Sequence, residues 1–329
     1  QTTDPFDLAA MRRYRRAVNY LAAAQIYLRG NGLLQEPLQA AHIKPRLLGH
    51  WGTAPGINLL YQHLNRLICE TDASVLMITG TGHGAAANLA NMYLEGTLAE
   101  YFPQMTRDAA GLDRFLRAFS WPDGFPSHLV PAYPGVIHEG GELGYALATA
   151  FGAAFDNPDL LVACLVGDGE AETGPTAGAW HSAKFLNAAT DGAVLPVLHL
   201  NDYKIANPTL FASMDDDELT ALFTGYGYRP RIVSLRDGAD IDVDLHAALR
   251  GAHDEIRDLQ AKARAGAAPA KPYWPMLVLR TPKGWTGPEN VDGKAIEGSF
   301  RAHQVPVKDP AQNPQHLRML EDWLRSYGP

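Results

Sequence analysis

The amino-acid sequence predicts an α/β protein with a doubly wound, mostly parallel sheet and helices on both of its faces. Short apolar runs of strand length recur along the chain, and segments with apolar residues at helical spacing separate them. Strands that alternate with helices in this way are joined by crossovers, which favour a parallel sheet. The run DLLVACLV at 159–166 is apolar throughout, as expected for a strand that helices cover on both sides.

The first predicted element is a helix over the Ala-rich segment 8–28, which has helical spacing and ends at the GNG sequence of 30–32. The run SVLMITG at 74–80 predicts a strand that ends in glycine, and a helix follows at 88–102. Further strands are predicted at 159–166, 193–202, 230–235 and 274–285, and further helices at 140–155, 173–187, 216–224, 242–263 and 316–329.

Composition and charge argue against several classes of protein. The 329 residues are 46% hydrophobic and 19% charged, as in a globular protein, and the net charge of −8 argues against nucleic acid or an anionic membrane as a general partner. No apolar stretch reaches the roughly 18 residues of a membrane span, and the N-terminus lacks the layout of a signal peptide. We therefore expect a cytoplasmic protein.

The two cysteines support the same compartment. Cys69 falls in a helical pattern and Cys164 in the apolar strand at 159–166. We expect both to be buried thiols rather than a disulfide, which indicates a reducing environment.

The sequence LVGDGEAETGP at 165–175 places an acidic residue at the end of that strand. Asp168 stands between Gly167 and Gly169, and glycines let a ligand or another backbone approach closely. The carboxyl ends of parallel strands are where open α/β sheets bind ligands. The alternative is an ordinary strand-to-helix turn in which Asp168 caps the helix, and the GDG sequence alone does not separate the two interpretations.

A second polar side chain, Asn201, follows the next predicted strand. If the two strands are neighbours, Asp168 and Asn201 converge at the same edge of the sheet. Together with the backbone carbonyl of Tyr203 they would offer the oxygen ligands that Mg²⁺ prefers, with phosphate oxygens and water completing its octahedron. Taken alone, Asn201 is equally well a turn residue.

Several longer motifs resemble the phosphoketolases, a family of thiamine diphosphate enzymes. GDG followed about thirty residues later by Asn is similar to the diphosphate and Mg²⁺ signature of thiamine diphosphate enzymes in general. The motifs that narrow the resemblance to phosphoketolases span about residues 46–306: RLLGHWGTAPGIN at 46–58, GHG at 82–84, PSHLVPAYPGVIHEGGELGYAL at 126–147, GDGEAETGP at 167–175, LNDYKIANPT at 200–209, RTPKGW at 280–285 and EGSFRAHQVP at 297–306.

The resemblance implies thiamine diphosphate and Mg²⁺ as cofactors and an aldehyde-lyase reaction. A phosphoketolase cleaves xylulose 5-phosphate or fructose 6-phosphate with inorganic phosphate into acetyl phosphate and a shorter aldose phosphate, either glyceraldehyde 3-phosphate or erythrose 4-phosphate. The substrates implied for this chain are therefore a ketose phosphate and inorganic phosphate, in carbohydrate metabolism.

The resemblance also implies roles for residues that match the motifs. The expected catalytic residues are His50, His83, His128, His303 and Gln304. The expected cofactor-binding residues are Gly141, Gly167, Asp168, Gly169, Glu170, Asn201 and Lys283, and the expected metal ligands are Asp168, Asn201 and Tyr203, the last through its carbonyl. His303 and Gln304 would contact substrate or phosphate, and the other three histidines would handle hydroxyl groups and protons. Without the resemblance, Lys283 would be an ordinary exposed lysine.

The implied organisation has three parts: an N-terminal helical segment at 1–45, the diphosphate-binding (PP) domain at 46–310 and a terminal helix at 311–329 that leads toward a pyrimidine-binding domain. In the family that second domain supplies the glutamate that activates the thiamine, usually from the partner subunit of a homodimer. We therefore expect this chain alone to be inactive, and to be completed by the rest of the same polypeptide or by a partner chain.

Some positions depart from the family pattern. Thr81, Ala85 and Ala86 replace a proline and a Gly-Pro pair around His83, and Asp202 replaces a glycine between the two Mg²⁺ ligands. If residue 202 has positive φ, aspartate costs roughly 1 kcal/mol more than glycine. Two alternatives therefore stay open: a transketolase-like enzyme that passes the two-carbon unit to an aldose, and a non-catalytic relative that uses the fold for binding.

Overall fold

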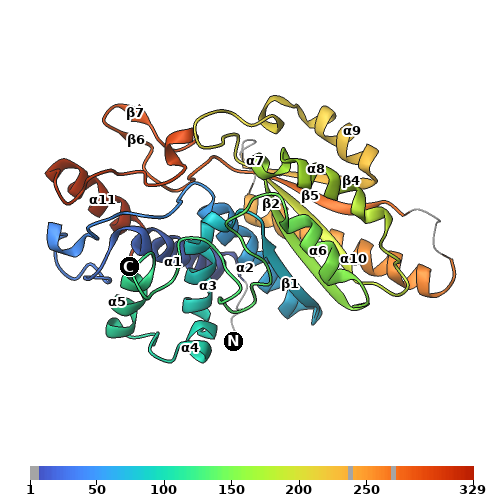
Figure 1. The fold of residues 1–329 in the computed structure, drawn as a ribbon, viewed down its shortest axis with the longest axis horizontal. Helices are drawn as coiled ribbons and strands as arrows, with labels where there is room; N and C mark the ends of the chain where they lie inside the picture. Colours follow the sequence, from blue (N-terminus) through green and yellow to red (C-terminus); the bar gives the residue numbers. More distant parts are fainter. Residues whose placement is uncertain (1–6, 236–239, 268–271) are drawn as a thin grey trace. The chain divides into compact units, whose positions relative to one another are not determined.

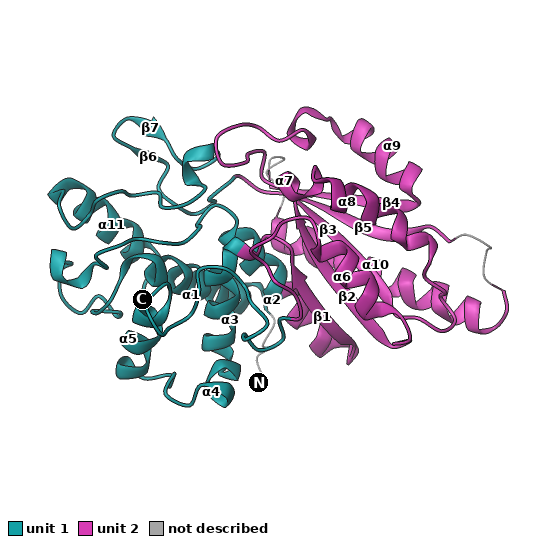
Figure 2. Cartoon of the chain, in the orientation of Figure 1, with its two compact units in different colours: residues 1–62, 83–136, 283–329 teal, residues 63–82, 137–282 magenta. Residues whose placement is uncertain are grey.

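The computed structural model describes residues 7–235, 240–267 and 272–329. The first six residues of the predicted N-terminal segment lie outside this part of the chain. The chain forms two compact units that interleave in the sequence (Figure 2). Unit 1 comprises residues 1–62, 83–136 and 283–329, and unit 2 comprises residues 63–82 and 137–282. Each unit is described by itself.

Unit 2 contains a five-stranded parallel sheet in the order β1-β2-β3-β5-β4 (Figure 1). The strands are β1 (Ser74–Thr79), β2 (Leu160–Gly167), β3 (Ala193–Leu200), β4 (Tyr228–Ser234) and β5 (Trp274–Arg280). The central strands β2, β3 and β5 are buried almost throughout, because their side chains are apolar on both faces. The predicted fold class and the predicted adjacency of the strands at 159–166 and 193–202 are confirmed.

Helices pack against this sheet, and residues close by in the sequence cap their ends. They are α6 (Ala146–Ala154), α7 (Asp168–Ala171), α8 (Gly174–Ala179), η3 (Trp180–Lys184), η4 (Phe211–Ser213), α9 (Asp216–Tyr226) and α10 (Ile241–Arg264). Helix α9 begins where the Asp215 carboxylate accepts a hydrogen bond from the Glu218 N–H at 2.8 Å, and it ends at Gly227, whose φ is 103°. Among the described residues no helix is long and apolar enough to cross a membrane.

Unit 1 is mainly helical. Its elements are α1 (Leu8–Tyr27), η1 (Ala40–His42), the first half of α2 (Ala54–Thr71), α3 (Ala85–Glu95), α4 (Thr97–Tyr101), α5 (Ala109–Ala118), the short ribbon of β6 (Asn290–Val291) and β7 (Lys294–Ala295), η5 (Phe300–Ala302) and α11 (Pro314–Ser326). The second half of α1 is continuously buried because its alanines let α3 and α5 pack closely against it. The turn η2 (Gly82–Gly84) joins the two units in sequence.

Four sequence predictions need correction. The helix predicted at 140–155 begins only at Ala146, because the preceding segment is rich in glycine and Gly144 has a φ of 110°. The helix predicted at 88–102 is split at Gly96, which has a φ of 98°. The strand predicted at 274–285 ends at Arg280, shortly before Pro282, which cannot donate to a ladder. Cys69 is exposed, since it lies on the outer face of α2, whereas Cys164 is buried as predicted.

Candidate active site

In unit 2, the carboxylate of Asp168 lies at the carboxyl end of β2 and is 3% exposed. Its Oδ2 accepts hydrogen bonds from the backbone N–H groups of Asn201 at 3.0 Å and Asp202 at 2.7 Å, and from Thr209 Oγ1 at 3.3 Å. Its Oδ1 accepts from the Gly169 N–H at 2.8 Å. Asp168 is the first residue of α7 and Gly167 is the N-cap, so the carboxylate joins β2 to the end of β3 rather than capping the helix.

Asp202 has a φ of 79°, which lies in the left-handed region. This is the positive φ at which aspartate is expected to cost more than glycine. The chain then turns back on itself, and the Thr209 N–H donates to the carbonyl oxygen of Asp202 at 2.9 Å. This turn brings Thr209 under Asp168, a contact that the sequence reasoning missed because only the turn relates residues 202 and 209. We name Asp168, Asn201, Asp202 and Thr209 the strand-end site.

The donor set fits a hard divalent cation. A carboxylate has about four lone-pair positions, and Oδ2 of Asp168 already accepts three hydrogen bonds whereas Oδ1 accepts one. A carboxylate together with amide and carbonyl oxygens is the ligand set that a hard divalent cation takes. Asn201 is 4% exposed, and the intermediate burial of Tyr203 leaves its segment accessible at the same strand end. Within the described ranges, no group of three or more His, Cys, Asp or Glu side chains could hold a metal, so Mg²⁺ would depend on the amide and carbonyl oxygens.

The glycines around Asp168 leave room for close packing. A Cβ on Gly167 would lie 2.4 Å from Cγ2 of Thr81, so Thr81, one of the departures from the family pattern, packs directly on the GDG turn. A Cβ on Gly169 would lie 3.0 Å from Cγ of Lys204. Gly141 lies in an exposed turn before α6, where its N–H donates to the carboxylate of Glu139 at 3.1 Å.

Glu170 follows the GDG sequence and is 2% exposed. Its carboxylate accepts hydrogen bonds from the N–H groups of Gly144 at 3.3 Å and Gly167 at 3.2 Å. Gly80 has no room for a side chain here, since a Cβ would lie 2.2 Å from Glu170 Oε2. Burial raises the pKa of Glu170 to about 7, although the two N–H groups partly oppose the shift.

In unit 1, four of the predicted histidines come together. The ring centroid of His50 lies 4.9 Å from that of His83, 5.3 Å from that of His128 and 5.2 Å from that of His303. The rings of His83 and His303 are 5.3 Å apart. Residues far apart in the sequence thus meet in one place. We name these four residues together with Lys283 the histidine–lysine cluster.

Burial and nearby positive charge lower the pKa values of His50, His83 and His303, which favours their neutral forms. Burial lowers the pKa of His50 to about 4, with further lowering by the charges of His128 and Lys283. Burial, followed by the charge of Lys283, lowers the pKa of His303 to about 3. The pKa of His83 falls well below its usual range for the same reasons. A neutral imidazole can both donate and accept a proton, which a charged one cannot.

Lys283 is buried, at 3% exposure, so the interpretation as an ordinary exposed lysine is wrong. The Nδ1 atoms of His50 and His303 are buried without a hydrogen-bond partner among the residues that the structure describes. Unsatisfied buried nitrogens are costly unless a ligand completes them, which favours this cluster as a binding site. Gln304 follows the cluster with an exposed side chain, and its carbonyl oxygen accepts from the Trp51 N–H at 2.9 Å.

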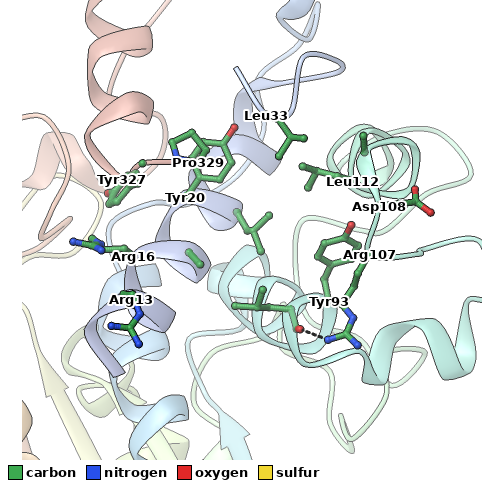
Figure 3. A pocket seen from close by; sticks show the side chains of 15 residues that line it. Arg13, Arg16, Tyr20, Leu33, Tyr93, Arg107, Asp108, Leu112, Tyr327 and Pro329 are labelled. Atoms are coloured by element: carbon green, nitrogen blue, oxygen red, sulfur yellow. Dashed lines mark hydrogen bonds between the residues drawn. The ribbon is translucent and has the colours of Figure 1, made fainter. Parts of the chain in front are cut away.

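A separate cavity in unit 1 has a volume of about 600 Å³. Figure 3 shows its lining, which comes from α1, the end of α3, the start of α5 and the last residues of the chain. The lining is largely apolar, and its Arg107 is engaged with the carbonyl oxygen of Leu94 at 3.0 Å. It contains no member of the histidine–lysine cluster, so its size alone does not make it the reaction site.

Comparisons with known proteins agree with the motifs. The sequence profile of the XFP N-terminal domain family matches residues 2–329. Proteins named "Probable phosphoketolase" from Rhodopseudomonas palustris, Mycobacterium avium and Synechococcus elongatus are 60%, 58% and 57% identical to this chain. They match over 98%, 98% and 100% of this chain but only 41%, 40% and 41% of their own length. The chain thus spans about two fifths of these relatives.

Solved structures show the same fold at low identity. Transketolase from Leishmania mexicana has a TM-score of 0.57 at 16% identity, over 98% of this chain and 45% of that chain. Transketolase from Campylobacter jejuni also has a TM-score of 0.57, at 18% identity over 95% of this chain and 42% of that chain. Since the family profile covers nearly the whole sequence, the chain belongs to the phosphoketolase family, as an XFP N-terminal domain.

Proposed function

We propose that the chain is the diphosphate-binding half of a thiamine diphosphate- and Mg²⁺-dependent phosphoketolase. The reaction would cleave xylulose 5-phosphate, fructose 6-phosphate or both with inorganic phosphate, giving acetyl phosphate, an aldose phosphate and water. The observation that carries the proposal is the cluster of four imidazoles beside a buried lysine, in a chain closely similar to proteins named as probable phosphoketolases.

The proposed roles follow from the chemistry of each group. Asp168, Asn201 and the carbonyl of Tyr203 would hold Mg²⁺, and Gly141, Gly167 and Gly169 would allow the diphosphate to approach the backbone. Lys283 would contribute a positive charge near phosphate. Thiamine diphosphate, when bound, supplies the electron sink for carbon–carbon cleavage.

The histidines would hold the hydroxyl and carbonyl oxygens of the ketose and move protons. His50, His83 and His128 would serve the hydroxyl groups, because a neutral imidazole can accept a hydrogen bond at one ring nitrogen and donate one at the other. His303 and Gln304 would contact the substrate or the incoming phosphate. At least one imidazole would accept a proton from a substrate hydroxyl group and return it to the hydroxyl group that leaves as water before phosphate attacks.

We further propose that the pyrimidine-binding domain comes from the rest of the same polypeptide or from a partner chain, in a cytoplasmic homodimer. The chain spans about two fifths of its relatives, which leaves room for such a domain in a full-length protein. On this proposal the described chain alone is inactive.

The test is acetyl phosphate formation by the full-length protein loaded with thiamine diphosphate and Mg²⁺. We expect acetyl phosphate only when inorganic phosphate is present, and a loss of at least about 100-fold in kcat for His83→Gln. The matched control is His181→Gln, which changes a histidine of unit 2 outside both sites. Transfer to an added aldose without acetyl phosphate would support the transketolase-like alternative, and no turnover at all would support a non-catalytic relative.

A further inference from the structure

Trp51 links three loops of unit 1. It follows the cluster residue His50 and is 0% exposed. Its backbone N–H donates to the carbonyl oxygen of Gln304 at 2.9 Å, and its indole Nε1 donates to the carbonyl oxygen of Gly284 at 3.0 Å. Both acceptors are the residues next in sequence to members of the histidine–lysine cluster. Through its backbone and its side chain, Trp51 therefore joins the loops that carry His50, Lys283 and His303.

The indole of Trp51 is closely packed on several sides. A Cβ on Gly287 would lie 2.6 Å from Trp51 Nε1, and a Cβ on Gly284 would lie 3.3 Å from Trp51 Cδ1. Gly284 also has a φ of 71°, where a side chain is strained. The rings of Trp51 and Trp323 meet edge to face, with centroids 5.0 Å apart. The 284–287 segment is thus wrapped around the edge of the indole.

The backbone next to Trp51 joins the same loops. The Gly52 N–H donates to the carbonyl oxygen of His303 at 3.4 Å, and the Gly284 N–H donates to the carbonyl oxygen of Gly52 at 2.8 Å. A Cβ on Gly52 would lie 3.0 Å from Cε of Lys283, so the lysine stem lies directly on this glycine. Trp51 and Gly52 therefore contact both the loop that carries Lys283 and the loop that carries His303.

We propose that Trp51 is a positioning residue that fixes the mutual spacing of His50, His303 and Lys283. The repulsion between these groups depends on their separation, and their desolvation depends on the loops staying closed. Loss of the indole contact would let the loops separate and admit water. The consequence for turnover rests on the proposed function, but the consequence for the imidazoles does not.

The experiment breaks the contact from both sides. Trp51→Phe removes the N–H donor and keeps an aromatic ring, whereas Gly287→Ala pushes on Nε1 and leaves Trp51 in place. The matched control is Trp274→Phe, since Trp274 is 1% exposed and its Nε1 has no hydrogen-bond partner within the described part of the chain. Circular dichroism checks folding at each pH.

The readout is NMR titration of the histidine rings of the full-length protein between pH 4.5 and 8, without ligands. In the parent and in Trp274→Phe, we expect His50 and His303 to stay neutral above pH 5. In Trp51→Phe and in Gly287→Ala, we expect their midpoints to rise by about one to two units as the rings gain solvation. The double variant should shift no further than the larger single variant, because both changes break one contact.

Unchanged titration in both single variants would overturn the proposal, as would an equal shift in Trp274→Phe. The turnover arm is separate: kcat for acetyl phosphate should fall about tenfold or more in Trp51→Phe with a smaller change in KM, because the reacting groups lose their alignment. If the parent makes no acetyl phosphate while the titrations shift as expected, the proposed function fails and the positioning role of Trp51 stands.

Discussion

The strand-end site of unit 2 and the histidine–lysine cluster of unit 1 are built in opposite ways. At the strand end, the carboxylate of Asp168 accepts four hydrogen bonds from groups of the adjoining turns. In the cluster, imidazoles from four separate loops meet, and Nδ1 of His50 and of His303 have no partner among the described residues. A carboxylate whose orientation is fixed by several hydrogen bonds is suited to hold a ligand in a fixed place. Partly unsatisfied imidazoles are suited to bind a substrate and move its protons.

Burial shifts the titration of the two regions in opposite directions. It raises the pKa of Glu170 to about 7 in unit 2 and lowers the pKa of His50 to about 4 in unit 1. The cause is the same in both, because a low-dielectric environment disfavours whichever form is charged. Burial therefore favours the uncharged form in both regions, but the effects on stability have opposite slopes with pH.

The largest effect is expected from Asp168→Ala. The buried N–H groups of Asn201 and Asp202 would lose their acceptor, so the free energy of unfolding should fall by about 2 to 4 kcal/mol. Urea unfolding measures it. Asp191→Ala is the matched control, because the Asp191 carboxylate also accepts backbone N–H groups, from Asp156 at 3.1 Å and Asn187 at 2.8 Å. Asp191→Ala should cost a similar amount, and a negligible effect of Asp168→Ala alone would contradict this account.

The next effect is a pH slope set by the cluster. His50 stays neutral in the folded protein down to about pH 4, whereas in the unfolded chain it takes up a proton below its ordinary pKa of 6.5. The contribution of His50 to the free energy of unfolding is therefore fully present above about pH 6.5 and is lost as the pH falls toward 4. His50→Asn should flatten this slope by up to about 1.4 kcal/mol per pH unit. Unfolding free energies at pH 4.5, 5.5 and 6.5 measure it. A slope equal to that of the parent would show that His50 is charged in the fold.

A smaller effect of opposite sign is expected from Glu170→Gln. Glu170 keeps its proton in the fold up to about pH 7, so its contribution is complete below about pH 4.5 and is lost as the pH rises through 7. At pH 8 the glutamine should therefore raise the free energy of unfolding by about 1 to 2 kcal/mol, and at pH 4.5 it should change little. A gain that is the same at both pH values would mean that ionisation is not its cause.

The smallest effect is expected at Asp202. Glycine accepts a φ of 79° without strain, so Asp202→Gly should gain about 1 kcal/mol of stability. Asp202→Asn distinguishes the effect of backbone strain from the effect of the negative charge, because asparagine removes the charge and keeps a side chain of the same size. Thermal unfolding of both variants decides: if asparagine stabilises as much as glycine, the charge beside Asp168 is the cause instead.

Much of the strand-end region could be predicted from sequence, because its signals are local. The apolar run of β2, the glycines around Asp168 and the alternation of strands with helices predict the parallel sheet. They also place Asp168 and Asn201 directly after two neighbouring strands, as the structure confirms. Asp202 has a positive φ, which is the condition under which the sequence predicts a cost for aspartate there. Thr209 gave no signal, because its contact with Asp168 depends on a turn of seven residues whose path the sequence does not reveal.

The histidine–lysine cluster could be identified only through the resemblance. No local pattern relates His50, His83, His128 and His303, which converge because separate loops are tied together in three dimensions. The burial of Lys283 was likewise not predictable from its position after a strand, since it depends on the loop around Trp51. The domain boundaries at residues 45 and 310 stay predictions, as do the individual roles of the site residues.

The most direct test of this division of roles is calorimetric titration of thiamine diphosphate into the full-length protein, with and without Mg²⁺. We predict binding that requires Mg²⁺, that weakens at least about 100-fold in Asp168→Asn and that changes little in His83→Gln, because Asp168 is a proposed metal ligand whereas His83 is a proposed substrate-binding residue. Binding that is independent of Mg²⁺ would contradict this division of roles. So would binding that is weakened as much by His83→Gln as by Asp168→Asn.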